Sequence, residues 1–135
     1  NCQALKLVMG GDGVTSIGKL AFYKCSNLEE INIPNSLTKI EESALGHCYY
    51  LSEITIPNSL ISIGVSAFDA TNIETLEIPA SVTFIGGRLC AGGKLKKYIV
   101  AEDNAHYCSD ENGSMLPPDA IFAKIKKTVD DYAGI

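Results

Sequence analysis

The sequence has no tryptophan, no long hydrophobic run and no excess of basic residues. Its apolar runs are only a few residues long, so we expect no membrane-spanning helix and no insertion into a bilayer. There are 16 Asp and Glu against 11 Lys and Arg, and the resulting net charge of −5 argues against nonspecific binding to nucleic acid. The 5 cysteines include no C-x-x-C pair, so we expect no zinc site. The 135 residues suffice for one domain with a packed core.

A segment of 22–23 residues is repeated from residue 1 to about residue 100. The run INIPNSLTKI, which ends at Ile40, returns as ITIPNSLISI and again as LEIPASVTFI. The closing isoleucine of each repeat stands at Ile17, Ile40, Ile63 and Ile85, and the proline stands at Pro34, Pro57 and Pro79. Such a period with Leu and Ile at fixed positions indicates a solenoid of leucine-rich-repeat type, in which stacked coils bury a common core.

Each repeat reads L-x-x-I-x-I-P-x-S-L/V-T-x-I-G-x-x-A-F-x-x-C. The alternating I-x-I segment predicts a short strand with one buried face, which the proline ends. The L-T-x-I segment predicts a second extended piece, and A-F-x-x-C predicts one helical or 3₁₀ turn. Gly18, Gly64 and Gly86 follow the second piece, where we expect a positive φ. The first repeat has Gly10 and Gly11 in place of Ile and Pro, which predicts a frayed strand there.

Stacking aligns equivalent residues of successive coils, and their apolar members are predicted to form the core. The expected core ladders are Leu28/Leu51/Ile73/Leu95, Ile31/Ile54/Leu76/Tyr98, Ile33/Ile56/Ile78/Val100, Leu37/Leu60/Val82 and Ile17/Ile40/Ile63/Ile85. No single coil can bury this lining alone, so stability is expected to come from neighbouring coils.

The repeats closely resemble the BspA-like leucine-rich repeats, whose pattern appears here as IPNSLTKIEESALGHC and IPNSLISIGVSAFDAT. The stretch YIVAEDNAHYCSDENGSML is similar to the irregular segment that often follows such an array. The resemblance implies an α/β repeat solenoid with right-handed coils of 22–23 residues and short parallel strands. It also implies a surface or secreted protein of a bacterium or a parasitic eukaryote, with adhesion to host proteins or other cells as its usual role.

We expect two parts in the chain. Residues 1–100 form a solenoid of about four coils that starts mid-repeat, and residues 101–135 form an irregular segment followed by a capping helix. The sequence after Pro118 places Ile121, Ile125, Val129 and Tyr132 on one face of an amphipathic helix, which either caps the last coil or belongs to a following domain. No initiator Met, signal peptide or polar cap precedes the first repeat, so we expect a piece of a longer product. Its uncapped N-terminal end is open to array neighbours or to self-association.

The cysteines and histidines are candidates for chemistry, but their placement favours packing. Cys2, Cys25 and Cys48 share one ladder, where we expect Cβ atoms about 4.8 Å apart. The two Cβ atoms of a disulfide are usually about 3.8 Å apart, so this spacing is too wide for one. We therefore expect free thiols in the core, with Cys90 also buried and Cys108 open to solvent. His47 and the adjacent Cys48 are predicted to point to opposite sides of the coil, which argues against a catalytic pair.

A weak calcium-loop pattern at Asp110 and Asn112 lacks an acidic residue at position 108, and the sequon at Asn112 is better explained as a turn. We therefore expect no metal and no cofactor.

The outward residues of the predicted strands remain as the candidate partner-binding surface. They are Glu30, Asn32, Glu53, Thr55, Thr75, Glu77 and Lys97 on the main strands, with Phe84 on the second extended piece. Leucine-rich repeats usually bind partners on the main strand face, an argument by analogy with the family. The alternative is that the exposed apolar residues are scattered and carry no function. We predict a non-catalytic protein-interaction module, and the alternative is a spacer or docking domain of a larger exported protein.

Overall fold

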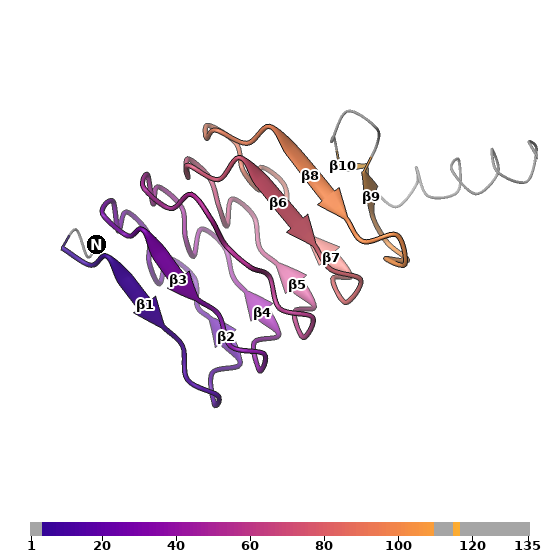
Figure 1. The fold of residues 1–135 in the computed structure, drawn as a ribbon, viewed down its shortest axis with the longest axis horizontal. Coiled ribbons are helices and arrows are strands. Elements are labelled where there is room, and N and C mark those ends of the chain that lie inside the picture. The colour runs from indigo at the N-terminus through magenta and orange to yellow at the C-terminus, as the bar shows by residue number, and fades with distance from the viewer. Residues whose placement is uncertain (1–3, 110–114, 117–135) are drawn as a thin grey trace, which may run out of the picture.

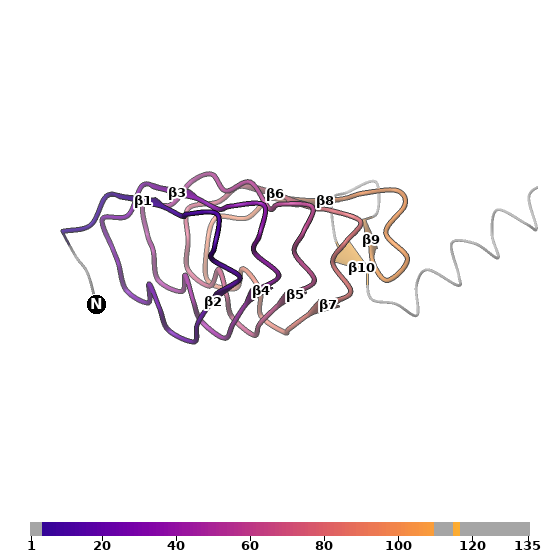
Figure 2. The ribbon, with the colours of Figure 1, turned by 90° about the horizontal axis from the view of Figure 1, so that it is seen from below.

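The computed structural model describes residues 4–109 and 115–116, and most of them form a solenoid of about four coils. Each coil contributes extended segments to two faces, and every strand pair of the solenoid is parallel. Figures 1 and 2 show the coils stacked along the long axis, with one set of strands on each face. The front face carries β1, β3, β6 and β8, and the second face carries β2, β4, β5 and β7. The predicted parallel-strand solenoid is therefore confirmed.

The second face carries a continuous four-stranded sheet. Its strands, in hydrogen-bonded order, are β2 (Ser16–Ile17), β4 (Lys39–Ile40), β5 (Ser62–Ile63) and β7 (Phe84–Ile85). The register pairs Ser16, Lys39, Ser62 and Phe84 in succession, as the 22–23-residue period requires. Successive side chains of a strand point to opposite faces, so the isoleucines enter the core while Lys39 and Phe84 face outward.

The front face repeats this arrangement only in part. β1 (Leu7–Met9) pairs with β3 (Glu30–Asn32), and β6 (Thr75–Ile78) pairs with β8 (Lys97–Val100). The sequence predicts a strand through Ile54 and Ile56 of the third coil, but residues 53–56 form none, and this prediction is wrong. Figure 1 shows the segment as a plain loop between β3 and β6. The front sheet is thus divided into two pairs of strands.

The first coil, in contrast, forms the strand that its glycines were predicted to fray. β1 pairs with β3 in full register, and the Gly10 N–H donates to the Asn32 carbonyl oxygen at 3.0 Å. A Cβ atom at Gly10 would lie 2.6 Å from Cδ of Pro34 in the next coil. Glycine at this position therefore allows the two coils to approach, and the predicted distortion of the first strand is wrong.

A third face consists of turns, where the sequence predicts a helical or 3₁₀ turn. No helix occurs in residues 4–109 and 115–116, so that prediction is wrong. In the first coil, Tyr23 and Cys25 donate N–H to the carbonyls of Leu20 and Phe22. The alternate amides bond differently, because those of Leu20, Phe22 and Lys24 donate to carbonyls of the next coil. Consecutive β-turns and a ladder between coils replace the expected helical bonds.

The left-handed residues of these turns are not the glycines that the sequence suggests. None of Gly18, Gly64 and Gly86 has a positive φ. Positive φ values of 53–60° occur instead at Leu20, Lys24, Ser43, His47, Ser66, Ala70 and Arg88. Gly64 is explained by packing, because a Cβ atom there would lie 2.5 Å from the backbone nitrogen of Glu42 in the preceding coil.

The predicted ladders line the core. The largest fully buried side chains are Leu28, Leu37, Ile40, Leu45, Leu51, Leu60, Ile63, Phe68, Ile73, Leu76, Ile78 and Val82. Other ladder members are partly buried and pack against this cluster, namely Ile33, Ile54, Ile85, Leu95 and Tyr98. The pattern confirms the inward register of every repeat, including the third coil, where Ile56 is buried although no strand forms.

The fourth coil is followed by an ordered segment centred on Asn104 and Tyr107. The Asn104 side-chain amide donates to the carbonyls of Pro79 and Val82, and its oxygen accepts the N–H groups of His106 and Tyr107. β9 (Cys108–Ser109) then pairs antiparallel with β10 (Met115–Leu116). The amphipathic helix expected after Pro118 lies outside the described residues, so the helical part of the predicted α/β class is not supported.

Candidate binding face

Seven of the eight predicted partner-binding residues lie exposed on the front face. They are Glu30 and Asn32 on β3, Glu53 and Thr55 on the third coil, Thr75 and Glu77 on β6, and Lys97 on β8. The structure gathers the first six around the divided centre of the sheet. Lys97 lies on the far strand, and Phe84 lies on β7 of the second face. The eight residues therefore do not form one surface.

Two clefts flank the third-coil segment on the front face. The first, of about 580 Å³, lies between β3 and residues 53–55 and is lined by Glu30, Asn32, Glu53 and Thr55 with apolar neighbours. The second, of about 500 Å³, lies between the same segment and β6 and includes Glu53, Glu74, Thr75 and Glu77. Both volumes fall in the range of about 300–1,000 Å³ that is usual for binding clefts. Nothing in the sequence signals these clefts, because repeat three has the same I-x-I-P pattern as repeat two.

The clefts carry an excess of negative charge. Glu30 and Glu53 border the first cleft, and Glu53, Glu74 and Glu77 border the second. Glu74 pairs with Lys96 at 3.5 Å, whereas no ion pair within residues 4–109 and 115–116 involves Glu30, Glu53 or Glu77. These three carboxylates are therefore available to a cationic partner.

The carboxylates at the borders of the two clefts, Glu30, Glu53, Glu74 and Glu77, form an acidic surface. A third hollow extends this acidic surface toward the turn face. It measures about 410 Å³ and is lined by Lys6, Glu29, Glu30, Tyr50 and Glu53, with Leu7 and Ser52. Tyr50 is 61% exposed, so its ring is available at the border of the acidic surface. Tyrosine rings attract cations through their faces, and this placement combines an aromatic ring with three carboxylates.

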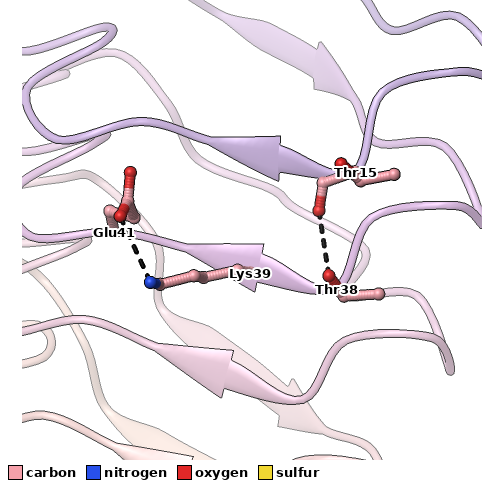
Figure 3. Close-up of polar contacts among 4 residues, drawn as sticks. All are labelled: Thr15, Thr38, Lys39 and Glu41. Carbon is pink, nitrogen blue, oxygen red and sulfur yellow. Dashed lines mark hydrogen bonds and ion pairs between the residues drawn. The ribbon is translucent and has the colours of Figure 1, made fainter.

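The second face presents a different surface, on which Thr15, Thr38, Ile61 and Thr83 form one column. The Thr38 hydroxyl donates to the Thr15 carbonyl oxygen at 3.1 Å, and Lys39 pairs with Glu41 at 3.3 Å (Figure 3). Phe84 is 55% exposed and Ile61 is 49% exposed. This face therefore carries two exposed apolar side chains on neighbouring coils, beside polar contacts.

The side chains of His47 and Cys48 point to opposite sides of the coil, which confirms the prediction from the sequence. The Cys48 thiol points inward and donates to the Phe22 carbonyl oxygen at 3.2 Å. The His47 ring lies instead against Tyr23 and Tyr49, with its Nδ1 atom 2.9 Å from the Tyr49 hydroxyl. A nucleophile and its base must come within hydrogen-bond reach, and this pair does not.

Cys25 and Cys48 are fully buried and are not joined by a disulfide, which confirms the ladder geometry. Burial, followed by the charge of Cys25, raises the pKa of the Cys48 thiol to about 12, and burial raises that of Cys90 to about 11. Both thiols are therefore protonated at neutral pH and are poor nucleophiles. Cys2 and the side chain of Cys108 lie outside the described part of the chain.

The described part of the chain contains no helix that is long and apolar enough to cross a membrane. Within residues 4–109 and 115–116, no three His, Cys, Asp or Glu side chains are grouped so that they could hold a metal ion.

The repeat pattern matches a known family over most of the chain. Residues 1–107 match the model for the BspA type leucine rich repeat region, with six copies. This chain belongs to the BspA-type leucine-rich repeat family. No protein of curated function matches the sequence. Family membership explains the coil pattern and the two-faced solenoid, and proteins built from such repeats are generally interaction modules without catalytic activity.

Solved structures of other leucine-rich repeat proteins share the fold. A leucine-rich repeat protein from Bacteroides ovatus is 38% identical with a TM-score of 0.68, and the match covers 74% of this chain and 26% of that one. The leucine rich repeat protein of T. pallidum is 31% identical with a TM-score of 0.69, covering 72% and 46%.

A leucine rich cell surface protein of Faecalibacterium prausnitzii is 28% identical with a TM-score of 0.59, covering 87% and 40%. This chain therefore spans about a quarter to a half of the solved chains that it matches.

Proposed function

We propose that this chain is a non-catalytic protein-binding module of a surface or secreted protein, and that its front face binds the partner. The observation that carries the proposal is the pair of clefts around residues 53–56, which six of the predicted partner-binding residues line or border. Adhesion to host proteins or to other cells is the role that we assign to this face. The cell surface name of the Faecalibacterium relative supports this location for the chain.

The charge of the front face selects the partner. Glu30, Glu53 and Glu77 have no cation beside them in the described part of the chain, and the whole chain carries a net charge of −5. Complementary charge accelerates association and suppresses like-charged partners. The partner surface is therefore basic, and its association rate falls as the salt concentration rises.

A cell-binding assay tests the proposal. Beads coated with the wild-type protein are incubated with epithelial cells, beside beads carrying the triple variant Glu30→Gln, Glu53→Gln, Glu77→Gln and beads carrying Phe84→Ser. We expect the triple variant to lose binding and the wild-type binding to weaken with salt. If the triple variant binds with unchanged affinity and salt dependence while Phe84→Ser loses binding, the second face is the binding site and the proposal is wrong.

The alternative function is that of a spacer or docking domain in a larger exported protein. It is favoured by the small share of the solved relatives that the chain spans, 26% of one and 46% of another. A spacer needs no accessible charged surface, so neither variant changes the behaviour of the protein that contains it. A bead assay without cell binding, together with full activity of an adjoining domain in both variants, supports this alternative.

A further inference from the structure

The divided front face leaves backbone hydrogen-bonding groups unpaired. The β1–β3 ladder extends from the Lys6 carbonyl to the Gly10 N–H, and the β6–β8 ladder extends from the Glu74 carbonyl to the Ala101 N–H. Among residues 4–109 and 115–116, no hydrogen bond reaches the N–H or C=O groups of residues 53–56. The nearest bond between coils three and four joins the Asn72 N–H to the Leu51 carbonyl oxygen at 2.9 Å.

The interruption is local and does not loosen the array. On the second face, Ser62 of the third coil is paired in register with Lys39 on one side and Phe84 on the other. The front segment itself is anchored at both ends, since Leu51 is fully buried and Ile56 is 7% exposed. The structure therefore holds an extended, solvent-accessible segment in place with unpaired groups on both sides.

Unpaired strand groups bind another extended chain. Such a chain adds its own N–H and C=O groups to the ladder, which provides affinity, while its alternating side chains provide specificity. Residues 53–56 differ from an ordinary sheet edge, because they line one surface hollow together with residues of β3 and another together with residues of β6.

The lining of the first cleft specifies the side chains of that partner. Glu30 and Glu53 are exposed on its outer rim, whereas Ile31 is buried and Ile54 is half-buried on its inner wall. Successive side chains of a strand point to opposite faces, so a chain lying here presents one set to the carboxylates and the other to the isoleucines. A peptide with alternating basic and apolar residues places its basic side chains beside the carboxylates and its apolar side chains against the isoleucines.

We infer that the front face binds an extended peptide segment in which basic and apolar residues alternate, and that this peptide pairs its backbone with residues 53–56. The inference rests on the proposed function of the front face and adds the mode of binding and the chemistry of the partner. Tyr50, at the border of the acidic surface, stacks on one guanidinium or ammonium group of the bound segment.

Amide hydrogen exchange of the whole chain tests the geometry. Unpaired, exposed amides exchange rapidly, so we expect Glu53, Thr55 and Ile56 to exchange much faster than Glu30 in β3 and Lys97 in β8, whose N–H groups donate to the carbonyls of Lys6 and Glu74. Equal protection of all five amides would mean that the front sheet is continuous in solution, and it would overturn the inference.

Peptide titration tests the binding mode. The probe is a seven-residue peptide of alternating arginine and valine, and the control is the same peptide with N-methyl groups on alternate backbone nitrogens, which keeps the charge and removes hydrogen bonds. We expect the probe to bind, to slow exchange at residues 53–56, and to lose affinity by about tenfold or more on N-methylation. Equal affinity of the two peptides, or no binding of the probe, overturns strand pairing.

Two protein variants assign the face. The triple variant Glu30→Gln, Glu53→Gln, Glu77→Gln is expected to weaken probe binding by about tenfold or more. Its matched control, Glu41→Gln, Glu42→Gln, Glu102→Gln, removes the same charge away from the clefts and is expected to bind nearly as the wild type does. Equal loss in both variants shows nonspecific charge attraction and overturns the inference. If cells bind the front face but the probe does not, the strand-pairing inference fails and the proposed function stands.

Discussion

The hydroxyl of Thr38 donates a hydrogen bond to the carbonyl oxygen of Thr15, one coil earlier on the second face (Figure 3). The same carbonyl also accepts the Thr38 N–H at 2.8 Å, so a single residue ties two coils together through both its backbone and its side chain. Thr83 repeats the arrangement toward Ile61, with a longer distance of 3.5 Å from its hydroxyl. This relationship explains why threonine recurs at this position of the repeat.

Replacing Thr38 by valine should lower the free energy of unfolding by about 0.5–1 kcal/mol, because one hydrogen bond is lost while the side-chain shape is kept. Urea denaturation of the two proteins measures the difference. Thr83→Val is the matched control, and its longer bond predicts a smaller loss. An equal loss in both variants would indicate that a feature other than the bond to Thr15 sets the preference.

Replacing Ile56 by aspartate should prevent folding. Ile56 lies in the core, and an unpaired buried carboxylate costs several kcal/mol, which is a large part of the stability of a domain of this size. Circular dichroism and gel filtration monitor the outcome. Thr55→Asp, one residue earlier on the exposed side, should fold normally. A soluble Ile56→Asp protein with a cooperative melting transition would contradict the repeat register.

Thiol titration should find Cys25, Cys48 and Cys90 unreactive in the native protein. All three are buried, and the raised pKa of Cys48 and Cys90 keeps those thiols protonated. Denaturant should expose all three to a thiol reagent, and mass spectrometry of labelled peptides identifies them. A native Cys25–Cys48 disulfide would refute the ladder geometry.

Stability should fall as the pH rises above about 9. Folding raises the pKa of Cys48 from 9.0 to about 12 and that of Cys90 from 9.0 to about 11. Below pH 9 both thiols are protonated in the folded and the unfolded chain, so their contribution to stability is fully present. Between pH 9 and 11 the unfolded chain loses these protons first, which favours unfolding. Melting temperatures across this range should fall less steeply for Cys48→Thr, since Thr71 fills the same position in the next coil.

Replacing Asn104 by alanine should destabilise the end of the fourth coil by about 1–3 kcal/mol. The side chain makes four hydrogen bonds, and its removal leaves the carbonyls of Pro79 and Val82 without this donor. Urea denaturation measures the loss. His106→Ala alters an exposed neighbour and should have little effect, and a comparable loss there would place the stabilisation elsewhere.

The sequence predicted most of the coil architecture because the period fixes the register. Equivalent residues such as Lys39 and Ser62 pair as a 23-residue repeat requires, and Ser36 and Ser59 each donate to a carbonyl of the preceding coil at 2.6 Å. The buried ladders follow from the same period, since a shift of one residue would turn the isoleucines to the outside.

The turn face and the divided front sheet could not be predicted in the same way. Left-handed backbone at Leu20 and Lys24 has no signal in residue type, because tertiary hydrogen bonds impose it on side chains that normally avoid it. The third coil has Ile54-Thr55-Ile56 where the second has Ile31-Asn32-Ile33, and these patterns predict the same strand. The candidate site depends on this difference, so the sequence indicated its charged residues but not its clefts.

The hydrogen bonds of the turn face give the solenoid a polarity. The amides of Leu20, Phe22 and Lys24 all donate toward the C-terminal neighbour, and the next two coils repeat this direction, as with Ser43 to Val65 and Ser66 to Gly87. The C-terminal end of this row of hydrogen bonds therefore presents N–H donors, and the N-terminal end presents carbonyl acceptors. Further coils can join only head to tail, and any segment that covers the donor end has to supply carbonyl or carboxylate oxygens there.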